Sequence, residues 1–96
     1  MVEGIVYILT NKKNSVLYTG VTSNLHERVK KHRDKTYDNS FTKRYNADKL
    51  VWFERQLTMG EAIKREKQIK GGSRQKKLDL INSVNPNWDD LYYTVD

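Results

Sequence analysis

Two short apolar runs joined by a polar turn constrain this chain more than any other feature of its sequence. GIVYILT (residues 4–10) is apolar and β-branched, as in a strand covered on both faces, and SVLYTGV (residues 15–21) predicts a second strand. The intervening NKKN (residues 11–14) predicts a reversal and therefore an antiparallel pair. A reversal centred on Lys12-Lys13 pairs Tyr7 with Tyr18. The sequence thus predicts that these two phenols are neighbours on one sheet face.

Beyond the hairpin, the pattern predicts one more strand and three helices. The expected elements are a helix at about 24–34, a polar loop at 34–48, a strand at 49–55, a helix from the capping box at 58–61 to Gly71-Gly72, and a helix from Ser73 to about Val84. Asn85-Pro86 ends the last helix. In the tail that follows, Trp88 and Leu91 are expected to dock on the core.

Length and composition set the class of protein. The 96 residues predict one domain, 1–96, and the absence of cysteine excludes disulfides and thiolate metal sites. No 18-residue apolar run or signal-peptide pattern is present, so a soluble cytoplasmic protein without a membrane partner is expected. The net charge of +6 is compatible with an acidic partner, most often nucleic acid.

The helix predicted at 24–34 carries charge on its apolar side. Leu25 and Val29 define the stripe, and the same helical spacing takes in Arg28 and His32. In the next helix Ala62, Ile63 and Ile69 mark the inward side, and Glu66 lies in the middle of it. Both helices therefore turn polar side chains toward a face that should be covered.

A buried, unpaired carboxylate costs several kcal/mol, so Glu66 needs a partner. One interpretation is structural: a Glu66–Arg28 ion pair with His32 hydrogen-bonded nearby. The other is functional: a metal ion on Glu66 and a phosphate on Arg28. Taken singly, each of these residues is more ordinary, since a strand tyrosine usually belongs to the core.

Taken together, these residues resemble a known family. Tyr7, then Tyr18-Thr19-Gly20, then Arg28-x-x-x-His32, then Glu66 is similar to the GIY-YIG nuclease pattern. That superfamily includes homing endonucleases and nucleases of DNA repair and recombination. The likeness spans about residues 4–91 and is greatest to the small stand-alone bacterial GIY-YIG (URI-type) proteins. Ile5-Val6-Tyr7 replaces Gly-Ile-Tyr, Thr19 replaces Ile, and no residue aligns with the asparagine that many members place after the glutamate.

The resemblance implies a fold and an activity. The fold is α+β, with a three-stranded antiparallel sheet flanked by about three helices. The activity is metal-dependent endonuclease cleavage of DNA, with Tyr7, Tyr18, Arg28, His32 and Glu66 as the catalytic set. Glu66 would hold a single Mg²⁺ or Mn²⁺ ion, because one carboxylate suits ions that keep several waters. Either tyrosine can be the base, and His32 can orient a phenol or relay its proton.

Candidate nucleic-acid contacts lie outside this set. They are Lys43, Arg44, Tyr45, Lys70 and Arg74, with Lys12 and Lys13 as further cations. A small domain has little surface for base readout, so single-strand- or structure-directed cutting is expected, by a monomer as the default. The alternatives are a nucleic-acid-binding domain of the same fold that cuts slowly or not at all, and a protein-interaction domain using the 34–48 loop.

Overall fold

A central antiparallel sheet organises the computed structural model, which describes residues 3–36 and 39–95. Its strands are β1 (Gly4–Thr10), β2 (Leu17–Thr22) and β3 (Lys49–Gln56), in the order β2-β1-β3. The helices are α1 (Leu25–Asp34), α2 (Ser40–Tyr45), α3 (Met59–Lys70) and α4 (Arg74–Val84), followed by the 3₁₀ helix η1 (Leu91–Thr94). The predicted α+β class and three-stranded antiparallel sheet are confirmed.

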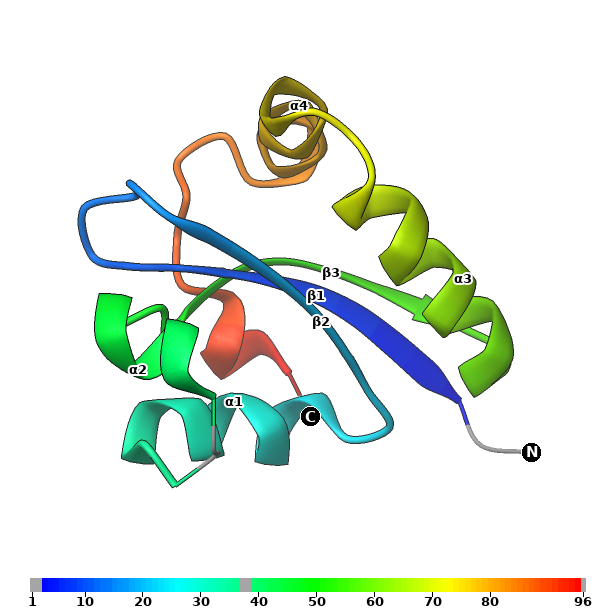
Figure 1. Cartoon of the computed structure of the whole chain (residues 1–96), viewed down its shortest axis with the longest axis horizontal. Coiled ribbons are helices and arrows are strands. Elements are labelled where there is room, and N and C mark those ends of the chain that lie inside the picture. Colours follow the sequence, from blue (N-terminus) through cyan, green and yellow to red (C-terminus); the bar gives the residue numbers. More distant parts are fainter. Residues whose placement is uncertain (1–2, 37–38, 96) are drawn as a thin grey trace.

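Helices cover both faces of the sheet (Figure 1), which separates two hydrophobic clusters. On one face, Ile5, Tyr7 and Leu9 of β1 pack with α1 and the C-terminal segment. On the other, Val6 and Ile8 pack with residues of α3 and α4. All of β1 is buried, which is why its sequence is apolar at successive positions rather than alternating. Trp88 and Leu91 pack against these two clusters, as expected for the tail.

The predicted register of the hairpin is wrong by two residues. Thr10 pairs with Leu17 and Tyr7 with Gly20, so the turn is longer than NKKN. Asn11 organises this turn: its Oδ1 accepts from the backbone N–H of Ser15 at 2.8 Å, and Asn14 adopts a φ of 56°. A shift of two residues keeps every side chain on its face. Tyr7 and Tyr18 therefore remain neighbours, with ring centroids 6.3 Å apart, as predicted.

Capping side chains set the starts of the three predicted helices. Asn24, Thr58 and Ser73 each accept a hydrogen bond from the backbone N–H three residues further on. The stop before Gly71-Gly72 is confirmed, since α3 ends at Lys70. No helix in the described ranges is long and apolar enough to span a membrane.

Two expectations for the helices are wrong. The segment predicted as loop (34–48, of which 37–38 fall outside the described residues) contains α2, capped by Asn39 and closed by Asn46 in the left-handed region. In α3, Ile63 is not on the inward stripe: it is 39 % exposed, and Arg65 takes the half-buried position instead. The Arg65 Nε donates to the Glu54 carboxylate of β3 at 3.0 Å, which explains how a cation is accommodated there.

Candidate functional site

Three side chains from separate elements form a buried hydrogen-bonded chain. The hydroxyl of Tyr7 on β1 lies 3.3 Å from Nε2 of His32 on α1. Nδ1 of His32 lies 3.1 Å from the hydroxyl of Thr42 on α2. All three residues are buried. His32, on the apolar stripe of α1, is therefore buried with a hydrogen-bond partner for each of its ring nitrogens.

The direction of the hydrogen bonds follows from Thr42. Its hydroxyl donates to the carbonyl oxygen of Asn39 at 3.2 Å, since a carbonyl can only accept. The Thr42 oxygen therefore accepts from Nδ1–H of His32, and Nε2 is left to accept the Tyr7 hydroxyl proton. This arrangement requires a neutral imidazole. Burial, and then the positive charge of Arg28 one helical turn away, lower the pKa of His32 to about 4.

Tyr18 is the third ring in a group that also contains Tyr7 and His32. Its ring centroid lies 5.7 Å from that of His32, and its hydroxyl accepts a hydrogen bond from the side-chain amide of Asn39 at 3.1 Å. The orientation of that amide is fixed, because its Oδ1 accepts from the backbone N–H of Thr42. Asn39 therefore ties Tyr18 to the same network as His32.

The two tyrosines differ in access to solvent. Tyr7 is completely buried, whereas Tyr18 is half-buried and lines a groove of about 560 Å³. The groove runs beside the edge strand β2 and is lined by Leu17, Tyr18, Thr19, Asn39, Ser40, Phe41, Lys70 and Lys77. We refer to it as the β2 groove. A molecule in this groove can meet the Tyr18 side chain but not that of Tyr7.

Gly20 is required by the position of Tyr7. A Cβ atom built on Gly20 would lie 2.5 Å from the Tyr7 hydroxyl oxygen and 2.5 Å from the ring carbon that bears it. Such contacts are far inside van der Waals range. The absence of a side chain at the glycine of Tyr18-Thr19-Gly20 thus makes room for the Tyr7 phenol.

Glu66 belongs to α3 and Arg28 to α1, and these two helices cover opposite faces of the sheet (Figure 1). The Glu66 side chain is 15 % exposed, and its carboxylate lies 3.4 Å from Nζ of Lys70, one turn further along α3. Lys70 also lines the β2 groove beside Tyr18. At the β2 groove, Lys70 of α3 therefore lies near Tyr18, and Glu66 is the ion-pair partner of that lysine.

The donor set around Glu66 restricts the metal that could bind. Among residues 3–36 and 39–95, no three His, Asp or Glu side chains gather as a metal-binding group. Zinc sites take at least three protein ligands, whereas Mg²⁺ and Mn²⁺ are commonly held by one or two carboxylates with water and substrate oxygens. A single half-buried carboxylate beside a groove fits the second kind of ion.

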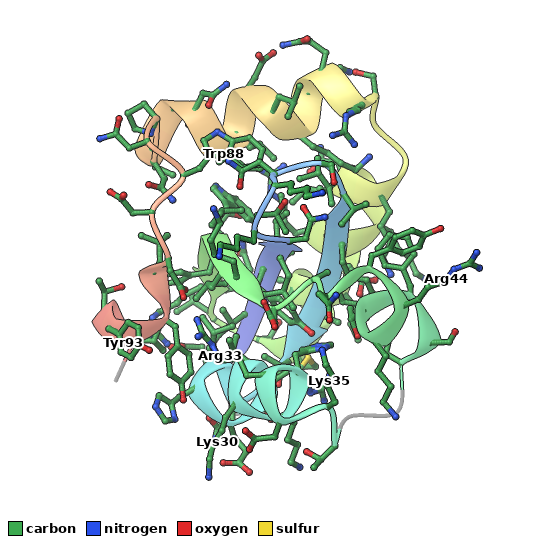
Figure 2. All side chains as sticks on the ribbon, turned by 90° about the vertical axis from the view of Figure 1, so that its left-hand side faces the viewer. Lys30, Arg33, Lys35, Arg44, Trp88 and Tyr93 are labelled. Atoms are coloured by element: carbon green, nitrogen blue, oxygen red, sulfur yellow. The ribbon has the colours of Figure 1, made fainter. Side chains whose placement is uncertain are left out.

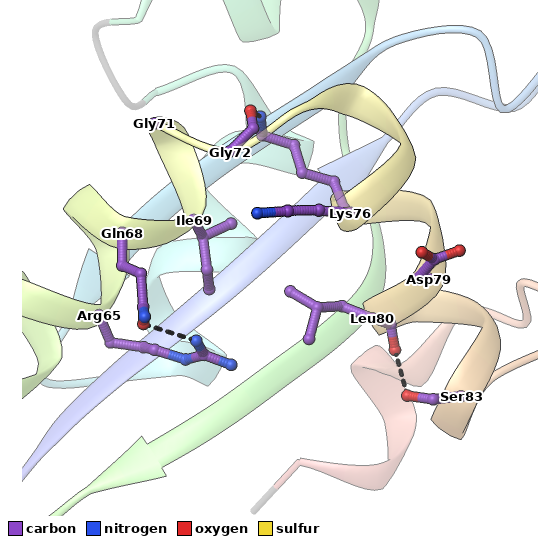
Figure 3. Close-up of a pocket in the computed structure, with 10 residues that line it drawn as sticks. Arg65, Gln68, Ile69, Gly71, Gly72, Lys76, Asp79, Leu80 and Ser83 are labelled. Carbon is purple, nitrogen blue, oxygen red and sulfur yellow. Dashed lines mark hydrogen bonds between the residues drawn. The ribbon is translucent and has the colours of Figure 1, made fainter.

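A second hollow of about 570 Å³ lies between α3 and α4 (Figure 3). Its floor is Ile69 and Leu80, on the face of the sheet away from the tyrosines. Arg65 at its rim is paired with Glu54 and Gln68, and Lys77 donates to the Gly72 carbonyl. Tyr7, Tyr18, Arg28, His32 and Glu66 do not line this hollow, whereas Tyr18 lines the β2 groove, so we place the candidate site at the β2 groove.

The predicted nucleic-acid contacts are distributed over two areas. Lys43, Arg44 and Tyr45 are exposed on α2, where Arg44 projects outward (Figure 2). Lys70 lines the β2 groove, whereas Arg74 donates to the Ser15 carbonyl at the hairpin turn. Sequence reasoning missed Asn39, Phe41, Thr42 and Lys77. The only signal for the first three was the spacing Asn39-x-x-Thr42, which is that of a helix cap.

Comparison with known proteins finds a matching family model and several related proteins. Residues 3–79 match the family model described as the GIY-YIG catalytic domain. A UPF0213 protein of Syntrophus aciditrophicus is 40 % identical over 81 residues, covering 84 % of this chain and 92 % of the relative. A UPF0213 protein of Staphylococcus saprophyticus is 42 % identical over 77 residues, covering 80 % and 92 %.

The solution NMR structure of a UPF0213 protein from Bacillus halodurans is also similar to this chain. It superposes with a TM-score of 0.57 at 30 % sequence identity, and 92 % of each chain is covered. The family match spans both tyrosines, Arg28, His32 and Glu66. The chain therefore belongs to the GIY-YIG catalytic domain family, in which it is similar to the small UPF0213 proteins.

Proposed function

We propose that this protein is a metal-dependent endonuclease that hydrolyses DNA phosphodiester bonds, acting on single-stranded or branched substrates. Membership of a family of nuclease catalytic domains supports the reaction class. The observation that carries the proposal for this chain is the groove: Tyr18, held by Asn39 and flanked by His32, opens into a surface hollow lined by two lysines.

Tyr18 is the catalytic phenol in this proposal. A general base must reach the water whose proton it takes, and Tyr18 borders the β2 groove while Tyr7 is enclosed. The amide N–H of Asn39 points at the Tyr18 oxygen, where it would stabilise negative charge. Tyr7 then serves as a positioning residue, since its hydroxyl holds the neutral His32 ring against Tyr18.

Arg28 is the phosphate-binding residue in this proposal. It is half-buried on α1, one turn before His32, and its charge is felt at the imidazole. A guanidinium offers two parallel N–H donors, which match two oxygens of a phosphate and stabilise the charge that develops at phosphorus. Burial, and then this charge, lower the pKa of His32 and keep its ring neutral, so the ring can accept the Tyr7 proton.

Glu66 is the metal-binding residue in this proposal. Glu66 would hold an Mg²⁺ or Mn²⁺ ion, which would supply positive charge for the leaving oxygen of the cleaved bond. The half-buried carboxylate pairs with Lys70 at 3.4 Å, so a bound metal ion would replace this lysine as its partner.

Cleavage of labelled DNA tests the proposal. Single-stranded, duplex and branched substrates are incubated with Mg²⁺, Mn²⁺ or EDTA, and Tyr18→Phe is compared with Tyr7→Phe and with Tyr93→Phe on η1. We expect metal-dependent nicking, slowed about a hundredfold or more by Tyr18→Phe, less by Tyr7→Phe and not by Tyr93→Phe. Binding without cleavage in every metal would instead favour an inactive nucleic-acid-binding domain of this fold. An active Tyr18→Phe protein would overturn the role given to Tyr18.

A further inference from the structure

Helix α2 exposes aromatic rings beside the candidate site. Phe41 is 39 % exposed and Tyr45 is 40 % exposed, while the buried residue of this short helix is a threonine. The Phe41 ring stacks on Tyr18 at 6.2 Å with an interplanar angle of 28°, and Tyr45 lies 4.9 Å from Phe41. These rings make a continuous aromatic surface that begins at Tyr18 and runs outward along α2.

Cations flank this aromatic surface. Lys70 and Lys77, from α3 and α4, line the β2 groove together with Phe41. The Arg44 guanidinium lies 5.4 Å from the centre of the Tyr45 ring. An occupant of this surface must offer both a flat apolar face and negative charge. A nucleotide in a single strand has both, as a base and a phosphate.

We propose that Phe41 and Tyr45 form a nucleobase subsite, on which an unpaired base next to the scissile phosphate stacks. The inference rests on the proposed function, because it takes Tyr18 to mark the position of the scissile phosphate. A base within a duplex is stacked on both sides and cannot lie on a protein ring without being turned out. The subsite therefore selects for an unpaired nucleotide at one position, whatever its sequence, because every base has a π-face.

The subsite is tested by binding in EDTA, where no metal-dependent cleavage takes place. The DNA is a hairpin with a short single-stranded tail, so that the junction fixes the register in which the tail binds. The tail carries 2-aminopurine, whose fluorescence is quenched by stacking, at one position at a time. Wild-type protein should quench the probe most strongly at one position. Phe41→Leu, which keeps apolar volume but removes the ring, should abolish that quenching and weaken binding by about five- to a hundredfold. Tyr45→Leu should have a smaller effect in the same direction.

Tyr93→Leu is the matched control, because Tyr93 is 82 % exposed and lies on η1 rather than on α2. It should leave quenching and affinity unchanged. A second measurement removes the stacked base from the DNA and leaves the Phe41 ring in the protein. An abasic site at the quenched position should weaken binding by wild type as much as Phe41→Leu does, and should not weaken Phe41→Leu further. The comparison of abasic with intact DNA can be made with wild-type protein alone if a variant fails to fold.

The outcomes separate this inference from the proposed function. Position-specific quenching that depends on Phe41, in a protein that cuts no DNA, would support the subsite and contradict the nuclease. Metal-dependent cutting with equal binding of abasic and intact strands would support the nuclease and overturn the subsite. Equal quenching at every position, or quenching that survives Phe41→Leu, would also overturn it.

Discussion

His32 is the residue at which structure and chemistry are most tightly coupled. It is 4 % exposed, accepts from Tyr7, donates to Thr42, and feels the charge of Arg28. Burial and the Arg28 charge favour the neutral ring, and the hydrogen bonds to Thr42 and Tyr7 favour its proton on Nδ1. Protonation would place a proton on Nε2, so the Tyr7 hydroxyl could no longer donate to that nitrogen.

Stability should therefore depend on pH through His32. Its pKa is about 4 in the folded chain against 6.5 in an ordinary peptide, so the unfolded state binds the extra proton as pH falls. The contribution is complete above pH 7 and is lost between pH 6.5 and 4, a difference of roughly 3 kcal/mol. Denaturant unfolding at several pH values measures it. The difference between wild type and His32→Gln isolates this residue from titrating carboxylates, and a difference that does not vary with pH would contradict the neutral assignment.

Thr42 should fix the tautomer of His32. Thr42→Val keeps the shape but removes the acceptor for Nδ1–H, leaving a buried donor unsatisfied at a cost of about 1–3 kcal/mol. Thr42→Ser keeps the hydroxyl and should restore most of the stability. The ¹⁵N shifts of the ring report the tautomer directly: Nδ1–H in wild type and Thr42→Ser, and a changed population in Thr42→Val. An unchanged ring spectrum in Thr42→Val would show that another group sets the tautomer.

At the scale of the element, the hairpin depends on one glycine. Gly20→Ala places a methyl group 2.5 Å from the Tyr7 phenol and should destabilise the fold by about 1–3 kcal/mol through overpacking. Gly60 in α3 offers the matched control, since the nearest atom to its Cβ position is 3.9 Å away. Gly60→Ala should stabilise by about 0.5–1 kcal/mol through helix propensity. Thermal unfolding of both variants checks the opposite signs, and equal shifts would argue against the close approach of Tyr7 to Gly20.

The elements that sequence predicts well are those with a local cause. The β-branched run at Gly4–Thr10 and the caps Asn24, Thr58 and Ser73 carry their signal within a few residues. Helix α2 does not, because its buried contact is the polar Thr42, which leaves no apolar period to detect. The hairpin register depends on the conformation of its turn, which the alternation of side chains cannot reveal.

The same distinction applies to the candidate site. Spacing along α1 and α3 was enough to single out Arg28, His32 and Glu66, because a charged residue on an apolar stripe is visible in the sequence. The roles of Asn39 and Thr42 depend on hydrogen bonds to residues on other elements. Only the folded chain makes those contacts evident.

At the scale of the whole molecule, one groove is lined by lysines from helices on one face of the sheet and by a tyrosine from the other face. Lys70 and Lys77 come from helices that cover one face of the sheet, and Tyr18 faces the opposite side. If single-stranded DNA binds here, log affinity should fall linearly with log salt concentration, with a slope of about −0.7 per phosphate neutralised. Lys70→Gln and Lys77→Gln should each reduce that slope by about one contact.

Lys64→Gln is the control for this salt dependence. Lys64 also lies on α3, but it borders a hollow with Gln56 at the β3 edge of the sheet. In fluorescence-anisotropy titrations, Lys64→Gln should leave the slope of log affinity against log salt concentration unchanged. A wild-type affinity that is flat between low and physiological salt would contradict nucleic-acid binding through this face.

Glu66 offers the most direct test of the proposed function. A metal ligand and a structural ion-pair residue predict opposite effects of Glu66→Gln on cleavage and on melting temperature. As a metal ligand, Glu66 is a half-buried charge retained for function. Glu66→Gln should abolish Mg²⁺- or Mn²⁺-dependent nicking while leaving the melting temperature in metal-free buffer unchanged or higher, and leaving DNA binding in EDTA intact. Glu61→Gln, an exposed change in the first turn of α3, should alter neither. Nicking rate and melting temperature are measured side by side on both variants. A large fall in the melting temperature of Glu66→Gln, with cleavage preserved at a permissive temperature, would contradict the account.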